Sequence, residues 1–367
     1  MTELEAYISL NSINIGSGRL NRLLEACGTP AGILRSSCDQ LQKIEGIGDK
    51  LARQIAGLRH KDLAPEFELI KKSKLDLLTL QDEAYPENLK KIYDPPILLY
   101  IKGKIDRMDN YSVAIVGSRQ ASFYGLSCAE RFAFELGSSG LTIVSGMARG
   151  VDTAAHKGAL RSKARTIAVI GSGFGHIYPD ENKELAEEIA RGGAVISEFP
   201  VDTSPLPQNF PRRNRVISGL SLAVLVAEAA RNSGALITAD FALEQGREVF
   251  ALPGRVDCDN AFGSNGLIKQ GAKLISCVED ILVELQLPLS EAVACKDTQN
   301  SSVMEKKNLS NDEAIVYNLL SHKPLSQDEI LEQSGFSLSQ LMHLLVSLEI
   351  KKNIHRSHRG EYEIVKG

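Results

Sequence analysis

Short apolar runs alternate with longer amphipathic stretches between residues 112 and 287. The runs are interpreted as strands at 113–116, 142–145, 166–170, 194–197, 222–226 and 248–251. The stretches between them predict helices at 125–139, 151–161, 181–191, 213–219 and 237–246. This alternation indicates an α/β fold, a parallel sheet with helices on both faces. Ligands of such sheets bind beyond the carboxyl ends of the strands, so the loops after the strands are the first places to look for function.

The first 65 residues predict a small helical domain. Over 41–55 one helical pattern ends at Gly46-Ile-Gly48 and another begins near Asp49. This is the pattern of a helix-hairpin-helix, in which the glycines let the backbone approach a DNA phosphate at a helix N-terminus. The same residues also fit a plain helical turn closed by a C-cap glycine. Both interpretations stay open at this point.

The next segment, 66–111, is interpreted as a connector with one apolar strand within 93–103, punctuated by Pro95-Pro96 and Gly103. Residues 112–287 form the main domain. Residues 288–310 are polar, without apolar periodicity, which predicts a linker.

Residues 311–367 predict a winged-helix domain. The pattern predicts helices at 311–320, 326–334 and 337–349, then a hairpin from 355–358 through Gly360 to 362–365. Such domains often place their third helix in the DNA major groove. Here that helix has no Lys or Arg before Lys351, and the domain is net acidic. A packing or protein-contact role is therefore favoured for it.

Composition is that of an ordinary globular chain, with 367 residues, 43% hydrophobic and 24% charged. No apolar run is long enough to span a membrane, and Glu3 and Glu5 make the first ten residues unlike a secretory signal. The six cysteines form no C-x-x-C pair and have no accompanying His cluster, so neither a disulfide framework nor a zinc site is expected. A cytoplasmic location follows as the expectation.

The net charge is −4, and no predicted domain is globally basic. Any nucleic-acid binding must therefore come from a focused patch of cations and from oriented backbone N–H groups.

The first candidate motif is a strand, a glycine turn and a helix around Gly117, Ser118 and Arg119. It lacks G-x-G-x-x-G, and Arg119 stands where that fingerprint has its second glycine. A bulky cation there would obstruct a pyrophosphate lying against the backbone. The same cation can grip a single phosphate, helped by Ser118 and the helix N-terminus. The alternative is a surface arginine in a tight turn.

The second motif follows the next strand, where Gly146 and Gly150 permit close backbone approach around Arg149. Asp152 is expected to cap the helix or to pair with Arg149. His156 lies inside the helix, and the spacing offers it no acidic or cysteine partner. It is interpreted as a packing residue without a catalytic role.

The most specific motif spans 208–219. Pro211 is expected at the first helical position, just after Phe210. The first turn then holds Arg212, Arg213 and Arg215. Cations there oppose the helix dipole, a conflict that a bound anion would relieve. An aromatic ring beside cations suits single strands, because bases stack on rings while arginines meet phosphates. One arginine can instead be buried in an ion pair, and Asn214 can simply brace the loop.

Two further loops complete the set. After the strand at 222–226, Ser233, Gly234 and Thr238 offer hydroxyl and N–H groups to an anion, or form an ordinary capped loop. Lys269, in the glycine-rich stretch 262–272, is expected to face the same edge.

Taken in order, these motifs resemble the DprA (Smf) family of DNA-processing proteins. The matching stretches are GSR at 117–119, SGMARGVDTAAH at 145–156, SEFP at 197–200, NFPRRNR at 209–215, NSGALITA at 232–239, ALPG at 251–254 and GSNGLIKQGA at 263–272. The helical N-terminus (helix-hairpin-helix or SAM-like) and the winged C-terminus also look like accessory domains of many members.

The resemblance implies an extended Rossmann-like core that binds single-stranded DNA without cutting it. It also implies a homodimer that loads the RecA recombinase onto incoming strands during natural transformation, with no cofactor or metal. Arg119 matches the family's phosphate-gripping arginine. The expected DNA-binding residues are Gly117, Ser118, Arg119, Gly146, Arg149, Gly150, Phe210, Arg212, Arg213, Asn214, Arg215, Ser233, Gly234, Thr238 and Lys269.

Two other functions are possible in principle. Nucleotide-processing enzymes of similar fold carry a P-G-G-x-G-T loop with a catalytic Glu and Arg, and this string is absent, as is G-x-x-x-x-G-K-[ST]. A pure RecA adaptor without DNA binding would not need Phe210 and its arginines. A non-catalytic DNA-binding protein is therefore the favoured interpretation.

Overall fold

The computed structural model describes residues 2–286 and separate positions beyond them. Those positions are 316, 320, 327–334, 336, 340–341, 344–345, 348, 354–356 and 362–364. The chain divides into two compact units, Met1–Val293 and Ala294–Gly367. The linker predicted at 288–310 lies outside the described residues.

The N-terminal region is helical, as the sequence predicts. Its helices are α1 (Glu3–Ser12), α2 (Ser17–Cys27), α3 (Pro30–Arg35), α4 (Cys38–Gln42), α5 (Asp49–Gly57) and α6 (Ala64–Ser73). The predicted hairpin is α4 and α5. The carboxylate of Asp49, in the first turn of α5, accepts from Gln42 and pairs with Arg53 at 3.0 Å. This helix N-terminus already carries an anion, which favours the plain-turn interpretation over a phosphate contact.

The centre of the first unit is one nine-stranded sheet in the order β1-β2-β6-β5-β4-β3-β7-β8-β9. The strands are β1 (Asp76–Thr79), β2 (Leu98–Gly103), β3 (Ser112–Gly117), β4 (Thr142–Ser145), β5 (Thr166–Val169), β6 (Ala194–Ser197), β7 (Ala223–Glu228), β8 (Glu248–Ala251) and β9 (Lys273–Leu274). All neighbouring strands from β6 to β9 pair in parallel. The predicted parallel sheet is therefore confirmed.

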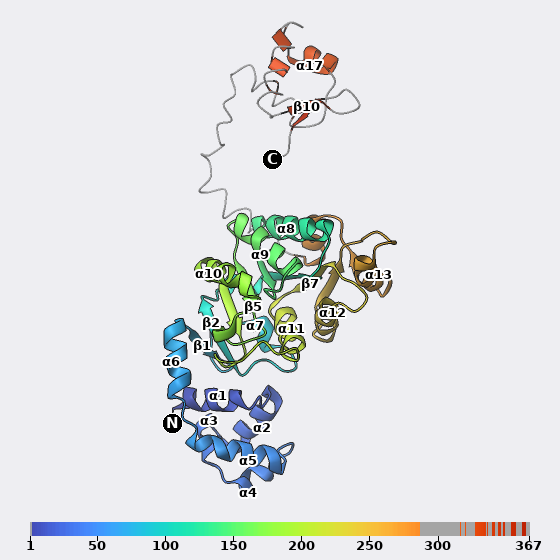
Figure 1. Ribbon diagram of the computed structural model, residues 1–367. Helices are drawn as coiled ribbons and strands as arrows, with labels where there is room; N and C mark the ends of the chain where they lie inside the picture. Colours follow the sequence, from blue (N-terminus) through green and yellow to red (C-terminus); the bar gives the residue numbers. More distant parts are fainter. Residues whose placement is uncertain are drawn as a thin grey trace. The chain divides into compact units, whose positions relative to one another are not determined.

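Helices cover both faces of this sheet (Figure 1). They are α7 (Glu87–Lys90), α8 (Phe123–Ser138), α9 (Val151–Arg161), α10 (Lys183–Gly192), α11 (Asn209–Leu220), α12 (Gly234–Glu244), α13 (Phe262–Lys269) and α14 (Val278–Glu284). Successive side chains of a strand point to opposite faces. In β3, Val113 and Ile115 accordingly pack with α8 and α9, whereas Ala114 and Val116 pack with α11 and α12. Burial on both faces explains the unbroken apolar runs.

The segment expected to be a connector, 66–111, instead extends the sheet. It supplies β1 and β2, and β2 pairs with β6 in antiparallel register, Tyr100 opposite Ser197. Residues 98–101 of β2 are buried. By pairing with β6, β2 covers an edge of the parallel sheet that would otherwise be open. The apolar strand agrees with the prediction, whereas its partner is not evident from the sequence.

The chain runs outward through β3, β4, β5 and β6, then returns to place β7 beside β3. The order of strands therefore reverses between β3 and β7. Such a reversal opens a crevice at the carboxyl ends of the two strands, where open α/β sheets bind their ligands.

The second unit contains α17 (Gln327–Ser334) and an antiparallel pair, β10 (Ile354–Arg356) with β11 (Tyr362–Ile364). Its small core is formed by Val316, Leu320, Ile330, Leu341, Leu345, Leu348 and Tyr362. The helix and the hairpin agree with the predicted winged helix. Most of the other two predicted helices and the turn at Gly360 lie outside the described residues. Over the described part of the chain, no helix combines the length and apolar character needed to cross a membrane.

Candidate functional site

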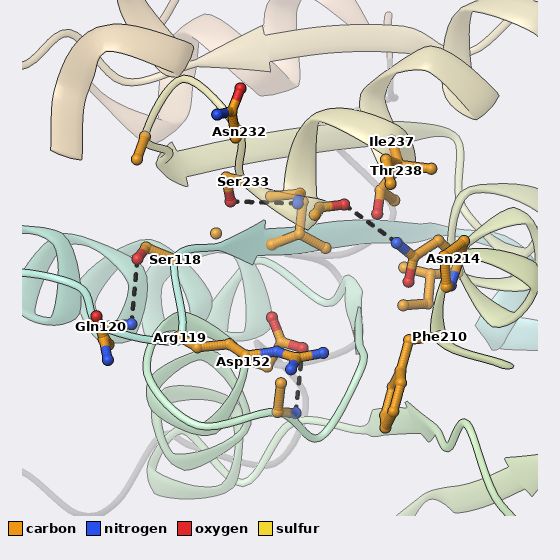
Figure 2. A pocket seen from close by; sticks show the side chains of 18 of the residues that line it. Ser118, Arg119, Gln120, Asp152, Phe210, Asn214, Asn232, Ser233, Ile237 and Thr238 are labelled. Carbon is orange, nitrogen blue, oxygen red and sulfur yellow. Dashed lines mark hydrogen bonds between the residues drawn. The ribbon is translucent and has the colours of Figure 1, made fainter. Parts of the chain in front are cut away.

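A cavity of about 1190 Å³ opens at the crevice between β3 and β7. Its walls come from the loop after β3, the loop after β7, the start of α11 and the start of α13. Figure 2 shows side chains from these loops converging on one space. A smaller cavity of about 150 Å³ lies next to it and shares Arg119, Tyr178 and Phe210. The cavity therefore lies at the sheet edge where the sequence places its unusual residues.

The loop after β3 is held in place by backbone contacts. The Ser118 N–H donates to the Glu228 carbonyl at 2.7 Å, and the Ser118 carbonyl accepts from Val151 N at 3.2 Å. Gly150 has φ +78°, and a Cβ there would lie 2.3 Å from the Ser118 oxygen. Only glycine at position 150 lets the loop after β4 pack this closely against the loop after β3. Gly150 thus supports the Arg119 loop from below and does not line the cavity.

Arg119 follows at the rim of this loop, with an exposed side chain. Its Cζ lies 5.0 Å from the centroid of the Phe210 ring. In Figure 2 its guanidinium and the Asp152 carboxylate extend into the same space. Within the described residues Arg119 has no ion-pair partner closer than 4.0 Å. Its charge is thus available to a ligand in the cavity.

Phe210 lies near the start of α11, which begins at Asn209 and not at Pro211 as predicted. Pro211 is the third helical residue, where the first four N–H groups lack helical partners and a missing N–H costs little. The Phe210 ring packs on Gly171, where a Cβ would come within 2.9 Å of the ring, and meets Tyr178 edge-on at 6.0 Å. The ring forms one wall of the cavity.

The arginines of α11 divide into two groups. Arg212 and Arg215 both pair with the buried Glu198 carboxylate, at 2.9 and 2.5 Å, and do not line the cavity. Arg215 also donates to the Asp94 carbonyl. The expectation that both bind DNA stays a prediction, but their charges face the buried carboxylate of Glu198 and not the cavity. The alternative of a buried ion pair is what the structure shows.

Arg213 reaches the cavity wall but is only 3% exposed. It donates to the carbonyls of Gly146 and Val169, the ends of β4 and β5. Burial lowers the pKa of Arg213 to about 10, while Asp152 beside it acts in the opposite direction. Arg213 therefore ties α11 to the sheet and adds positive charge behind the cavity.

Asp152 and Arg149 do not pair with each other, contrary to one expectation. Arg149 makes a two-pronged ion pair with Glu181 and lies over Tyr178 at 5.7 Å. Asp152 accepts from Ala148 N at 3.2 Å, and burial raises its pKa. Arg149 and Gly146 line the smaller cavity. His156 is fully buried with Nδ1 2.7 Å from Thr166 Oγ1, which agrees with a packing role.

The opposite wall is the loop after β7. Ser233 caps α12 by accepting from Ala235 N at 3.3 Å, and Asn214 Nδ2 donates to the Gly234 carbonyl at 3.2 Å. Thr238 lies one turn further along α12, beside Asn214 in Figure 2. The structure thus brings together most of the predicted residues, including Gly117, Ser118, Arg119, Phe210, Arg213, Asn214, Ser233, Gly234 and Thr238.

Lys269 is not among the lining residues. It ends α13, whereas Phe262 at the beginning of this helix lines the cavity. Seven helical residues carry Lys269 about 10 Å along the helix axis. The expectation that it faces the same edge is therefore corrected.

Sequence reasoning missed several lining residues: Gln120, Tyr178, Arg231, Asn232, Asp259 and Phe262. Tyr178 and Phe262 each pair with an arginine, Arg149 and Arg231 respectively, but these pairs form only once the loops are folded. No group of three or more His, Cys, Asp or Glu side chains gathers as a metal site anywhere in the described part of the chain. The cavity offers a free guanidinium, hydroxyls and aromatic rings, which suit a phosphate joined to a planar base.

Comparisons with known proteins agree with this architecture. A family model described as DNA recombination-mediator protein A matches residues 76–286, and one described as the DprA winged helix domain matches residues 301–358. Protein Smf of Escherichia coli is 48% identical over 214 residues, which cover 58% of this chain and 57% of that protein. DNA processing protein DprA of Streptococcus pneumoniae is 43% identical over 224 residues, 61% of this chain and 77% of the relative. The chain thus spans little more than half of the E. coli relative.

Two solved structures are similar as well. The X-ray structure of DprA from S. pneumoniae superposes with a TM-score of 0.69 at 35% identity, covering 78% of this chain and 99% of that one. DNA processing protein A from Helicobacter pylori superposes with a TM-score of 0.52 at 32% identity, covering 58% and 97%. The H. pylori protein is described as having a unique single-stranded DNA binding mode.

Proposed function

This chain belongs to the DNA recombination-mediator protein A family, also named DprA or Smf, and on that premise we propose that its cavity binds single-stranded DNA. The observation that carries the proposal is the placement of Arg119 and Phe210 in one cavity at the switch point of the sheet. An exposed guanidinium suits a phosphate, and a ring beside it suits an unpaired base. The H. pylori protein, described as a binder of single-stranded DNA, supports the proposal by its similarity of fold and sequence.

The charge distribution supports a local mode of binding. The whole chain carries −4, yet Arg119, Arg213 and Arg231 line the cavity against Asp152 and Asp259. Burial raises the pKa of Asp152, while the neighbouring Arg213 acts in the opposite direction. An anion is therefore attracted within the cavity but not by the protein as a whole.

We propose a binding role without catalysis. The two serines of the cavity wall, Ser118 and Ser233, accept hydrogen bonds from nearby backbone N–H groups. Neither is hydrogen-bonded to a histidine or carboxylate within the described residues, and His156 faces Thr166. Nucleophilic catalysis needs a nucleophile in hydrogen-bond reach of a base. The proposed role is to hold a strand and not to cut it.

The finer role proposed is that of a homodimer that protects incoming single strands and loads RecA onto them during natural transformation. The family description, a recombination mediator, and the names of the relatives support this role. Measurement of the dimer mass in solution and of RecA filament growth on strands precoated with this protein would test each part separately.

The first experiment is fluorescence anisotropy of a labelled oligonucleotide, single-stranded against double-stranded, over a salt series. We expect preference for the single strand and affinity that falls as salt rises, because phosphate contacts release counterions. Absence of binding to either form would reject the proposal and would turn attention to nucleotide or nucleotide-sugar ligands.

A further inference from the structure

We propose that Phe262, with Arg231 over its ring, is a second base-stacking platform, so that the cavity holds two separated bases of one strand. The inference rests on the function proposed above and extends it. It concerns residues that the sequence motifs did not single out and that line the same cavity as Phe210.

The pair repeats the arrangement of the first platform. Arg231 Cζ lies 5.3 Å from the centroid of Phe262, much as Arg119 Cζ lies 5.0 Å from that of Phe210. All four side chains line the same cavity. Phe262 is 44% exposed, so a large part of its ring is free to contact a ligand. Aromatic rings flanked by arginine are the surfaces on which unpaired bases stack.

The chain on both sides of Phe262 is held by hydrogen bonds to neighbouring loops. The Gly263 N–H donates to the Ala229 carbonyl at 2.7 Å, and a Cβ at Gly263 would lie only 2.7 Å from that oxygen. The first turn of α13 therefore packs directly on the loop after β7. Asn260, two residues before Phe262, donates to the Gln120 carbonyl at 3.1 Å and ties this segment to the Arg119 loop. A ring held in this way loses little entropy when a base stacks on it.

The sheet sets the distance between the two platforms. Phe210 packs on Gly171, just after β5, whereas the turn that carries Phe262 packs at the end of β7. Two strands, β4 and β3, lie between them. Three strand spacings amount to about 14 Å. This is about four times the 3.4 Å rise between bases in a DNA strand.

Two neighbouring bases cannot occupy both platforms at this separation, so other nucleotides lie between them. A base on either ring must have one face free of its neighbour in the strand. Ser118, Arg119 and Ser233, on the loops after β3 and β7, offer polar groups to the phosphates between the two bases. Because the bases inside a duplex are stacked on both faces, the two rings would favour single-stranded over double-stranded DNA.

The test uses a short labelled oligonucleotide in which one abasic site is moved along the sequence. Wild-type protein should lose affinity at two positions separated by at least one tolerant position. Phe262→Leu should weaken binding of the intact oligonucleotide by about 5- to 100-fold and remove one of the two sensitive positions. Phe262→Tyr keeps a ring and should bind like the wild type.

Phe134→Leu is the matched control. Phe134 lies under Arg161 at 4.9 Å, but on α8, away from the cavity-lining residues, so its loss should leave binding unchanged. Wild-type affinity of Phe262→Leu alongside weak binding of Phe210→Leu would overturn the second platform and leave the proposed function intact. Equal losses of DNA affinity for Phe262→Leu and Phe262→Tyr would also overturn it. So would a fall in the melting temperature of Phe262→Leu large enough to account for its weaker binding. Absence of binding by the wild type would reject the function and this inference together.

Discussion

The guanidinium of Arg119 lies over the ring of Phe210, with Cζ 5.0 Å from the ring centroid. Arg119 comes from the loop after β3 and Phe210 from the first turn of α11, ninety-one positions further along the chain. Their meeting places a charge for phosphate next to a surface for a base. A base that stacks on Phe210 would therefore have the cation for its phosphate within reach.

Arg119→Ala should weaken single-strand binding by about 1–3 kcal/mol, as expected for loss of one charged hydrogen-bonded contact. The slope of log affinity against log salt concentration should also become shallower by about one unit, because one phosphate contact is lost. Fluorescence anisotropy over a salt series measures both. Lys269→Ala is the matched control, because this cation lies at the far end of α13 and should change neither. Unchanged affinity of Arg119→Ala would instead favour an adaptor that does not grip DNA.

Phe210→Ala should weaken binding by about 1–3 kcal/mol if one base stacks on the ring. The ring packs on Gly171 and Tyr178 but is only partly buried, so the melting temperature should fall modestly. Anisotropy and thermal unfolding on the same sample separate the two effects. A large fall in melting temperature with unchanged affinity for DNA would identify Phe210 as a core residue.

Glu198→Gln should lower the free energy of unfolding by about 3–5 kcal/mol, because two arginine charges lose their buried partner. Glu181→Gln, which removes the exposed partner of Arg149, should cause no measurable change. Urea unfolding of the two variants provides the comparison. The Glu198 cluster is Glu198 with Arg212 and Arg215. Equal stability of the two variants would mean that this cluster contributes little to folding.

Acid should destabilise the protein through His156. Burial lowers its pKa to about 3, whereas an unfolded histidine titrates near 6.5. The unfolded state therefore binds the proton first, and stability that is present above pH 6.5 is lost as the pH falls toward 3. At pH 5 the loss should be about 2 kcal/mol relative to pH 8. Urea unfolding of His156→Gln should lack this part of the pH dependence, and identical profiles would contradict the assignment.

The core of the sheet could be predicted because its strands are buried on both faces. The strands at 142–145, 194–197 and 248–251 have the predicted bounds, and each contains two or three consecutive apolar residues. The antiparallel pairing of β2 with β6 escaped prediction, because a single apolar strand carries no sign of its partner. Its place is decided by the edge that β6 leaves open.

The arginines show the limit at the site. Arg212, Arg213 and Arg215 lie within four consecutive positions, yet only Arg213 reaches the cavity wall. The difference is made by Glu198, which accepts from the other two and lies in the loop after β6. A local pattern of charges cannot show where a distant carboxylate will lie. The place of Arg119 in the cavity could be predicted, because the turn that begins at Gly117 directly follows a strand and carries this side chain to the end of the sheet.

The Glu198 cluster also has a consequence for folding. The carbonyl of Glu198 accepts from Asn11, 187 positions away, and Arg215 donates to Asp94 across 121 positions. Closing such long stretches of chain costs entropy that must be met before these contacts stabilise anything. The position of α11, and with it the Phe210 wall of the cavity, therefore depends on segments far apart in the sequence. A truncated chain that lacks Asp94 or the N-terminal helices is expected to hold this wall less firmly than the full chain does.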